Sequence, residues 1–326
     1  MKKTLLVLIM LCFAMGNLFA MSGSGTVGDP YIITTPSDLA LVMDDANFAT
    51  YWASGVYIEL GANVDMNGQS GIDPIGNNSN TFSGQFNGKG YVISNLNINA
   101  PSLSYQALFG YIETGATVSN LGVEDATVFG NIYVGGFVGW NKGTITNCYA
   151  TGDATGQSED VGGFCGRNEG IIENCYATGN TDGDSDVGCF LGDNYYGTIE
   201  NCYATGDATG QSQVGGFVGH NDNGTYTCCF WNETANSGLD DSGNDGDLGN
   251  EVTGLSETQF ADPSSFSCFD FNNDWAMGYN VVDSEYLYPM LRAFDYVVIP
   301  TLTEWAVIIF IGLLAGVGGW FVWRRM

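Results

Sequence analysis

A unit of about 27 residues recurs along the middle of the chain, and it limits the possible folds more than any other feature. The letters NCYATGDATGQS occur at 147–158 and again at 201–212, and the shorter NCYATG occurs at 174–179. A period of 26 to 29 residues indicates a solenoid, a propeller or an array. The longer units and two diverged earlier copies begin at Val134, Val161, Val187, Val214, Tyr105 and Phe82.

Each unit holds two or three short segments rich in Val, Ile, Phe and Tyr, separated by Gly-Asn or Gly-Asp turn signals. A propeller blade needs four strands and more residues than one unit offers. One coil of a parallel β-helix fits the length. The sequence therefore predicts an all-β fold, a right-handed parallel β-helix-like solenoid of about six coils stacked about 4.8 Å apart.

A cysteine occurs at the same place in four successive units, and earlier units have Leu121 and Leu96 there. A position that accepts leucine or cysteine is an apolar interior position. We therefore predict that these thiols fill the core, in preference to a metal site or a set of disulfides. The four residues are Cys148, Cys175, Cys202 and Cys229.

Other cysteines fall into two groups. Cys165 aligns with valine and leucine positions and is also predicted to be buried. Cys189 and Cys228 depart from the repeat pattern, and Cys268 lies beyond it. These three are the better candidates for a disulfide outside the cytoplasm, with the connectivity left open.

An asparagine precedes the cysteine position in successive units. Side chains at one corner of each coil can bond their neighbours, so we predict a structural ladder in preference to a ligand role. Its members are Asn95, Asn120, Asn147, Asn174 and Asn201.

The ends of a solenoid expose sheet edges and need caps. Thr35 is predicted to be the N-cap of a helix with Pro36 in its first turn. The expected apolar face of this helix is Leu39, Leu41, Val42 and Phe48. The predicted organisation is a cap with the first strands over 21–80, the repeat solenoid over 81–235 and a C-terminal capping region over 236–291.

The termini predict export and membrane attachment. Residues 1–20 have two lysines, an apolar run and small residues, as in a secretory signal peptide. After a linker with a sorting motif at 292–304, residues 305–323 carry no charge and are long enough to be a transmembrane helix. The basic residues in 324–326 are expected to stay cytoplasmic.

Net charge excludes some partners. The chain has 36 acidic and 8 basic residues. Four of the basic residues and Glu304 lie in the end segments, which leaves 35 acidic and 4 basic residues in 21–300. Such a surface repels nucleic acid, so none is expected as a partner, and it suits divalent cations or high solubility outside the cell.

The unit VGGFVGxNxGxIxNCYATG resembles the GLUG motif of bacterial surface and secreted proteins. The flanking segments GDPYIITTPSDLALV, FSGQFNGKGYVISNLNI and FWNETANSG agree in order, so the resemblance covers roughly 28–291. It implies an exported β-helix-like protein, often an adhesin or a large envelope protein. Some relatives carry a zinc peptidase domain, but the chain has no HExxH and its one histidine is His220.

The segment IPTLTEW, followed by the apolar span and two arginines, resembles the IPTL-CTERM sorting signal. This resemblance implies processing by an exosortase-type enzyme in a Gram-negative envelope, with display or release afterwards. Ala306 stands where glycine is usual, which is a mild departure. The implied recognition residues are Ile299, Pro300, Thr301, Leu302 and Trp305.

Catalytic residues are not predicted. One histidine does not make a nucleophile–His–acid set, and among 35 acids some pair meets glycosidase spacing by chance. Four equivalent positions hold different side chains, which could form a sugar-binding stripe, although ordinary variation at an exposed turn is the preferred interpretation. They are Trp140, Arg167, Asp193 and His220.

Calcium is a possible ligand, because two acidic loops place carboxylates around glycines. Neither loop matches an EF-hand, and solvated acidic loops are the preferred interpretation. The candidate residues are Asp182, Asp184, Asp186, Asp240, Asp241, Asp245 and Asp247.

The sequence thus predicts an exported surface protein of the cell envelope, without enzymatic activity. Its β-helix is expected to serve adhesion or envelope structure by binding an unknown surface glycan or protein. Two alternatives stay open: a polysaccharide-active β-helix enzyme and a calcium-stabilised passive stalk.

Overall fold

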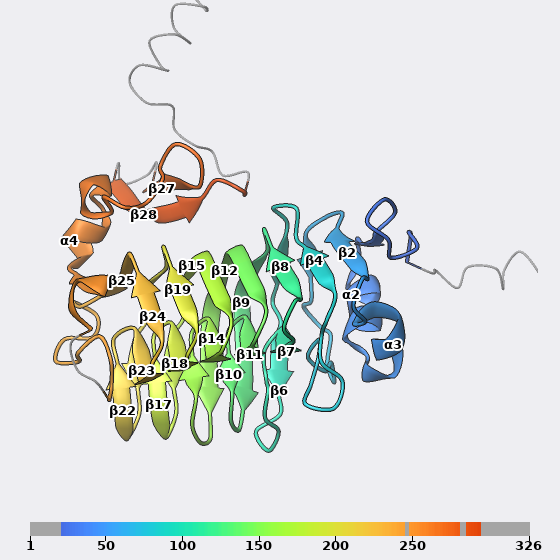
Figure 1. Ribbon diagram of the computed structural model, residues 1–326, viewed down its shortest axis with the longest axis horizontal. Helices are drawn as coiled ribbons and strands as arrows, with labels where there is room; N and C mark the ends of the chain where they lie inside the picture. Colours follow the sequence, from blue (N-terminus) through green and yellow to red (C-terminus); the bar gives the residue numbers. More distant parts are fainter. Residues whose placement is uncertain (1–20, 245–247, 281–284, 295–326) are drawn as a thin grey trace, which may run out of the picture.

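The computed structural model describes residues 21–244, 248–280 and 285–294, which form a mostly β protein built on a parallel β-solenoid of about eight turns (Figure 1). One face contains a strand from each turn. In order these are β1 (Tyr31–Ile33), β2 (Tyr57–Leu60), β4 (Gln85–Asn87), β8 (Thr117–Ser119), the start of β12 (Thr144–Gly156), β15 (Ile171–Ala177), β19 (Thr198–Glu200) and β24 (Thr225–Thr227).

The predicted parallel solenoid is therefore confirmed, but the expected number of six coils was too low. The additional turns come from the N-terminal segment, whose sequence has diverged from the repeat. Tyr31 pairs with Ile58, and Tyr57 pairs with Gln85, in the same parallel register as the repeats. The parallel backbone pairing thus extends into the N-terminal segment, although the repeated side-chain pattern is not found there.

The next face continues around each coil in two runs. The first comprises β3 (Val64–Asp65), β5 (Val92–Ser94), β9 (Gly122–Gly130), the middle of β12, the end of β15, β20 (Tyr203–Ala204), β25 (Cys229–Asn232) and β26 (Val252–Leu255). The second comprises β6 (Asn97–Asn99), later parts of β9 and β12, β16 (Thr181–Asp182) and β21 (Ala208–Thr209).

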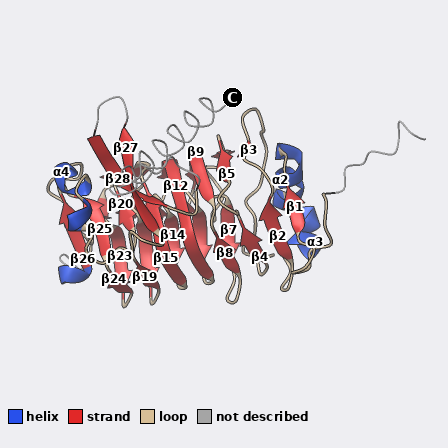
Figure 2. Cartoon of the chain, turned by 90° about the horizontal axis from the view of Figure 1, so that it is seen from above, coloured by secondary structure: helices blue, strands red, loops and turns tan. Residues whose placement is uncertain are grey.

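Two smaller sheets complete the coils. One has β10 (Val134–Gly135), β13 (Val161–Gly162), β17 (Ser185–Gly188) and β22 (Ser212–Gly215). The other has β7 (Phe109–Ile112), β11 (Val138–Asn141), β14 (Cys165–Asn168), β18 (Leu191–Tyr195) and β23 (Val218–Asp222). Figure 2 shows the strands side by side along the axis, with helices at both ends.

The pairing distance of 27 residues is broken at several places, and one break is restored within the same coil. Thr155 pairs with Asp182, but Val161 pairs with Val187, so the intervening turn is one residue shorter in the later coil. An additional residue at 195–196 compensates, because Ile171 pairs with Thr198 again 27 positions on. This length change is absorbed in turns, which leaves the flanking strands in register.

Stacked side chains fill the interior. The four repeated cysteines are at most 1% exposed, and Cys148 pairs in register with Cys175. Each of their thiols donates to the carbonyl oxygen two residues earlier, at 3.1 to 3.5 Å. Cys165 is also buried and pairs with Val138 and Leu191. Parallel phenylalanine rings stack beside them: Phe137, Phe164, Phe190 and Phe217.

The predicted corner asparagines all adopt left-handed backbone, with φ between 50° and 57°. Asparagine tolerates this conformation better than most residues, which explains its recurrence there. Cross-coil bonds join part of the set: Asn147 Nδ2 donates to Asn120 Oδ1 at 3.3 Å, and Asn120 Nδ2 to Asn87 Oδ1 at 3.1 Å. The buried Oδ1 of Asn174 has no hydrogen-bond partner within the described ranges.

A second asparagine ladder, not predicted from the sequence, lies inside the solenoid. Asn141, Asn168 and Asn194 are 0% exposed. Asn141 Nδ2 donates to Asn168 Oδ1 at 2.9 Å, and Asn168 Nδ2 donates to Asn194 Oδ1 at 3.1 Å. The Oδ1 atoms of Asn141 and Asn168 also accept from the amides of Gly143 and Gly170. This ladder satisfies polar groups that burial would otherwise leave unpaired.

The N-terminal end carries α2 (Pro36–Met43), η1 (Asp45–Asn47) and α3 (Phe48–Tyr51). Thr35 is the N-cap of α2, and its side chain accepts from the Asp38 amide in a capping box. The apolar face differs from the expectation: Leu39 and Val42 are buried, but Leu41 and Phe48 are 37% and 40% exposed. Helix α2 ends at Met43, so Phe48 belongs to a separate helix, α3.

Beyond the repeats, η2 (Gly249–Glu251) leads into β26, which extends the solenoid by pairing with β25. The chain then turns back as a C-terminal arm, 256–294. It contains α4 (Glu257–Phe260), η3 (Pro263–Ser265) and the antiparallel pair β27 (Trp275–Asn280) and β28 (Glu285–Leu291). Figure 1 shows this arm lying along one flank of the solenoid, where only closure of the end had been expected.

The arm covers a tyrosine column, Tyr149, Tyr176 and Tyr203, whose stacked rings point out of the solenoid. Trp275 packs on two of these rings, and Tyr203 Oη donates to the Pro289 carbonyl at 2.6 Å. A disulfide joins Cys228 to Cys268, two of the three cysteines that the sequence singled out, whereas Cys189 is free and buried. The arm and column thus form a second apolar cluster outside the main core.

The predicted signal peptide at 1–20, the sorting residues at 299–305 and the helix at 305–323 lie outside the described residues. Within the described ranges, every helix is too short or too polar to cross a membrane.

Candidate binding surface

A row of half-buried and buried side chains runs along the axis on the outer side of the β7–β11–β14–β18–β23 sheet. The four stripe positions are paired in direct register, Trp140 with Arg167, Arg167 with Asp193 and Asp193 with His220. Tyr111 extends the row by pairing with Trp140. The stripe was expected at a turn, but these residues are on strands, which holds them at fixed spacing.

A second row lies beside the first, at the residue just before each Val-Gly or Gln-Ala pair. All its members have left-handed backbone, with φ between 51° and 64°. Tyr133 packs on Trp140 with ring centroids 4.9 Å apart, and Asp160 lies 3.9 Å from Arg167. We call the two rows together the outer ladder. The second row is Tyr105, Tyr133, Asp160, Asp186 and Gln213.

The N-terminal end of the outer ladder is aromatic. The rings of Tyr111 and Trp140 stack 5.1 Å apart at 11°, and those of Tyr105 and Trp140 stack 5.9 Å apart at 3°. Tyr133 closes the group at 5.0 Å from Tyr105. Tyr111 is 8% exposed, whereas the other three aromatic residues are half-buried.

Two cations cover the aromatic end. Lys142 Nζ lies 4.8 Å from the Trp140 ring centre, and the Arg167 guanidinium lies 5.1 Å from it. Lys142 also pairs with Glu169 at 3.1 Å. The Arg167 guanidinium in addition stacks 4.6 Å from the Tyr195 ring. Cation–π contacts of this kind fix the long side chains in place.

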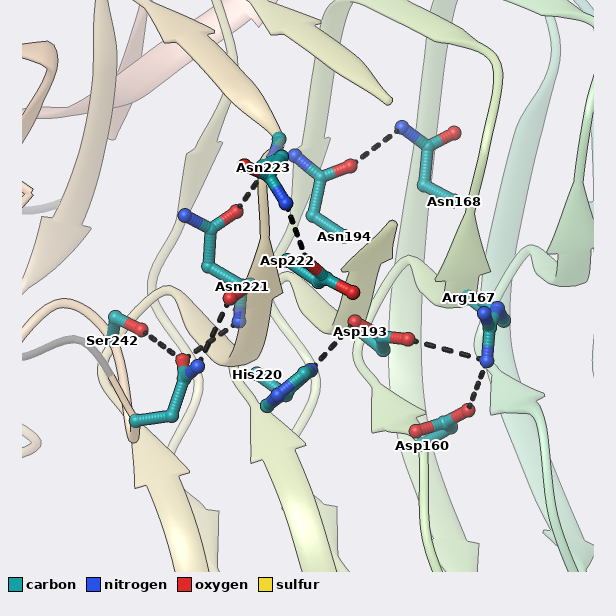
Figure 3. A network of polar contacts seen from close by, with 12 residues as sticks. Asp160, Arg167, Asn168, Asp193, Asn194, His220, Asn221, Asp222, Asn223 and Ser242 are labelled. Carbon is teal, nitrogen blue, oxygen red and sulfur yellow. Dashed lines mark hydrogen bonds and ion pairs between the residues drawn. The ribbon is translucent and has the colours of Figure 1, made fainter. Parts of the chain in front are cut away.

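The aspartates of the outer ladder lie between its aromatic end and His220, and Figure 3 shows two of them, Asp160 and Asp193. Asp193 is held between Arg167 at 3.3 Å and His220 Nδ1 at 3.0 Å. Burial, reinforced by Asp193 and Asp186, raises the pKa of Asp160 to about 8, although Arg167 opposes this. Burial also raises the pKa values of Asp186 and Asp193. Asp160 is therefore largely protonated at neutral pH, which leaves it able to donate a hydrogen bond.

Several polar atoms of the outer ladder have unused hydrogen-bonding capacity. Trp140 Nε1, Arg167 Nε and Asp186 Oδ1 are buried without a hydrogen-bond partner in the part of the chain that the structure describes. Arg167 Nε is only an ion-pair neighbour of Glu169, at 3.5 Å. Buried polar groups are usually paired, so three unpaired atoms on one surface mark it as unusual.

The calcium candidates do not converge. Asp182 and Asp184 are exposed and line one shallow groove. Asp186 belongs to the outer ladder. Both carboxylate oxygens of Asp241 accept from the Leu248 amide at 3.0 Å. No group of three or more His, Cys, Asp or Glu side chains is placed to hold a metal ion within the described ranges. Asp245 and Asp247 lie outside those ranges.

Sequence reasoning identified one row of the outer ladder and missed the other. The missed signal was positional: the residue before each Val-Gly pair varies from Tyr to Asp to Gln while its neighbours repeat. This residue varies although its neighbours repeat, and its left-handed backbone is costly for a residue other than glycine. Strained positions of this kind often occur at functional sites.

The repeats match a known motif. A model of the GLUG motif matches residues 130–155 and 157–181, so the chain carries GLUG repeats. The chain is 34% identical over 143 residues to Halomucin of Haloquadratum walsbyi, covering 41% of this chain and 2% of Halomucin. It is 35% identical over 139 residues to a candidate Gly-rich membrane protein of Evansella cellulosilytica, covering 40% of this chain and 15% of that protein.

The chain therefore spans a small part of the curated relatives that it matches. Among solved structures, a candidate immunoglobulin A1 protease from Bacteroides ovatus superposes with a TM-score of 0.63. The match covers 84% of this chain and 95% of that one at 22% identity. At this identity the likeness shows the shared solenoid fold alone.

Proposed function

We propose that the protein is an exported component of the cell envelope whose solenoid serves adhesion, with the outer ladder as its contact surface for a glycan. The observation that carries this proposal is the in-register placement of aromatic and charged side chains from five successive strands along one face of the solenoid. The proposed role is binding, not catalysis.

A glycan suits this chemistry. Sugar rings present apolar C–H faces and a rim of hydroxyl groups, and the ladder offers aromatic rings beside donors and acceptors. Trp140 and Tyr105 supply rings, Arg167 and Lys142 supply donors, and Asp186, whose Oδ1 has no hydrogen-bond partner within the described ranges, supplies an acceptor. Convergence of a few polar groups on an aromatic surface is typical of ligand sites. The strand spacing places successive side chains about 4.8 Å apart along the axis, which suits a chain-like ligand.

An envelope location is supported by several features. The Cys228–Cys268 disulfide suits an oxidising compartment. Residues 1–20 carry the signal-peptide pattern, and 299–305 resemble a sorting motif, which implies an exosortase-type enzyme as processing partner. One of the relatives is itself named as a candidate membrane protein.

The test is retention of the full-length protein on an array of neutral, acidic and amino-substituted glycans. We expect binding to at least one class, with about tenfold weaker binding after Trp140→Ala or Arg167→Ala, which is about 1.4 kcal/mol. Ile171→Ala is the matched control, because Ile171 is 45% exposed on another face of the solenoid. Melting temperatures show whether each variant is folded.

Absence of binding to any glycan, or wild-type affinity in both ladder variants, would contradict the proposal. Release of reducing or unsaturated ends from a bound glycan would instead favour the polysaccharide-active enzyme. Measuring these ends on the same samples keeps the two functions apart.

A further inference from the structure

We infer that the rings of Tyr195 and Tyr196 form a subsite for an uncharged sugar beside the outer ladder, which rests on the proposed function and adds the class of glycan to it. Tyr195 lies two positions after Asp193 of the ladder, at the end of β18. We call these two rings the tyrosine pair.

The tyrosine pair lies at a turn that is one residue longer than the same turn of the preceding coil. Asn168 pairs with Asn194, 26 positions on, whereas Ile171 pairs with Thr198, 27 positions on. The additional residue leaves two tyrosines at this turn, and they are 36% and 62% exposed. They are therefore more accessible to a ligand than the half-buried and buried rings of the outer ladder.

Tyr196 has a backbone conformation that does not suit its side chain. Its φ is 57°, and Asn223, which lies 27 positions on in the next coil, has a φ of 58°. Asparagine tolerates left-handed backbone, whereas a bulky residue is uncommon there. Backbone geometry alone would thus favour asparagine at both positions. An exposed ring held in this conformation is a candidate for a functional role.

The geometry of the tyrosine pair suits a sugar. The two ring centroids are 4.8 Å apart, and the ring planes meet at 82°. Within the described ranges neither phenol hydroxyl has a hydrogen-bond partner. One ring can pack on the apolar C–H face of a sugar while the other ring contacts its edge, and the two hydroxyl groups can bond sugar hydroxyl groups.

Polar groups border the tyrosine pair. The Tyr196 amide donates to the Asp222 carbonyl at 3.0 Å. Asn223 Nδ2 donates to Asp222 Oδ1 at 2.6 Å, and the Asn223 side chain is exposed (Figure 3). An apolar protein segment would need a wider apolar surface than two rings. A sugar instead combines a small apolar face with a polar rim, which matches these surroundings.

The tyrosine pair is continuous with the outer ladder. The Arg167 guanidinium lies 5.1 Å from the Trp140 ring centre and 4.6 Å from the Tyr195 ring centre, so it contacts both rings. Trp140 and Tyr195 come from coils two apart, which is roughly 10 Å along the axis. A chain-like glycan in contact with Trp140 can therefore also reach the tyrosine pair.

The charges near the tyrosine pair favour an uncharged ligand. Lys142 pairs with Glu169 at 3.1 Å, and Arg167 lies 3.3 Å from Asp193 and 3.5 Å from Glu169. Both cations already have carboxylate partners, so neither is left to balance the charge of an acidic sugar. The 35 acidic and 4 basic residues of 21–300 also repel a polyanion as a whole. An uncharged sugar avoids both costs.

The test is calorimetric titration of the full-length protein with short oligosaccharides. The neutral probes are oligomers of glucose, mannose and N-acetylglucosamine, and the acidic probe is an oligomer of galacturonic acid. Tyr196→Asn removes the more exposed ring with a residue type that tolerates the turn, and Tyr196→Phe keeps the ring. Tyr91→Asn is the matched control, because Tyr91 is 37% exposed beside Phe294 of the C-terminal arm.

We expect a neutral oligomer to bind, with about tenfold weaker affinity after Tyr196→Asn because an aromatic contact is lost. The Tyr196→Phe and Tyr91→Asn proteins should bind nearly as the wild type does. A higher salt concentration should leave the affinity for the neutral oligomer unchanged, since the ligand carries no charge to be screened.

Wild-type affinity in the Tyr196→Asn protein would overturn the subsite, and weaker binding by Trp140→Ala would then leave the proposed function standing. Binding of the acidic oligomer alone would overturn the ligand class and leave glycan binding standing. Absence of binding to every oligomer would overturn the subsite, and an array without any bound glycan would overturn the proposed function with it.

Discussion

Tyr149 and Tyr176 lie face to face on the outer wall of the solenoid, with ring centroids 4.8 Å apart and planes within 1° of parallel. They are one coil apart in the sequence and hold the same place in the NCYATG motif. Both are less than 5% exposed because the C-terminal arm covers them. The repeated tyrosine therefore serves the attachment of a segment more than 80 residues further along the chain, as the bond from Tyr203 to Pro289 shows.

Tyr176→Ala should loosen the arm. It removes the central ring of the column and its contact with Trp275, at a cost of about 3–5 kcal/mol if the site behaves like other large-to-small core substitutions. Tyr196→Ala, at a residue 62% exposed, should change stability by less than about 0.5 kcal/mol. Denaturant unfolding of both variants measures the difference, and equal midpoints would show that the column does not support the fold.

Reduction of the Cys228–Cys268 bond should release part of the arm without unfolding the solenoid. The bond closes a 40-residue separation, for which chain entropy gives a stabilisation of about 4 kcal/mol. We expect limited proteolysis within 256–294 to accelerate after reduction, while the repeats stay resistant. A Cys228→Ser/Cys268→Ser variant should be cleaved quickly with or without reductant. An unchanged cleavage rate in the reduced wild type would contradict this role.

Asn168→Ala should destabilise the solenoid more than any surface substitution. Asn168 accepts from Asn141 and from the Gly170 amide and donates to Asn194, all in the interior. Its loss leaves buried partners unpaired, at about 2–4 kcal/mol in total. Asn67→Ala is the control, because Asn67 is exposed. Calorimetric melting compares the two, and similar melting temperatures would mean that water replaces the lost bonds.

Asp160→Asn should flatten the pH dependence of stability between about pH 4 and pH 8. The folded protein holds a proton on Asp160 up to a pKa of about 8, whereas the unfolded chain releases it near 3.8. The free energy of unfolding must therefore fall as pH rises through this window, by on the order of a few kcal/mol. The whole of this decrease is present above pH 8. The amide of asparagine has no proton to lose.

Urea unfolding at several pH values between 4 and 9 measures this effect as the difference between the wild type and the variant. Asp186, Asp193, Glu159 and Arg167 also act on Asp160. Because burial raises the pKa values of Asp186 and Asp193, the variant should retain a smaller slope from these two aspartates. If the free energy of unfolding depends on pH with the same slope in both proteins, a group other than Asp160 has the raised pKa.

Much of the fold could be predicted, because backbone pairing repeats where the sequence repeats. The apolar position of Cys148 and the helix start at Thr35 are local patterns, and both are found in the structure. The number of coils could not be predicted, since Tyr31–Ile33 and Tyr57–Leu60 pair by backbone geometry without the repeated side chains. The exposure of Leu41 could not be predicted either, because it depends on which side of a short helix meets the solenoid.

The candidate site was only half visible in the sequence. Register alone places Arg167 beside Trp140 and Asp193, and the repeat alignment contains that information. The contact of Asp160 with Arg167 depends on a left-handed turn that brings back a residue seven positions earlier in the chain. No repeated residue type marks this turn, because the residue that adopts it changes along the solenoid from tyrosine to aspartate to glutamine.

The unbroken 27-residue spacing from Cys148 to Cys175 also bears on how such a protein can change over generations. A deletion of 148–174 would join Asn147 to Cys175 and restore the motif NCYATG at the junction. Every internal stack would become shorter by one member, and Trp140 would then be followed in its row directly by Asp193. Unequal recombination between repeats can therefore remove or add one whole coil, which changes the order of side chains in the outer ladder. The remaining coils keep the same stacking of hydrophobic side chains in the interior.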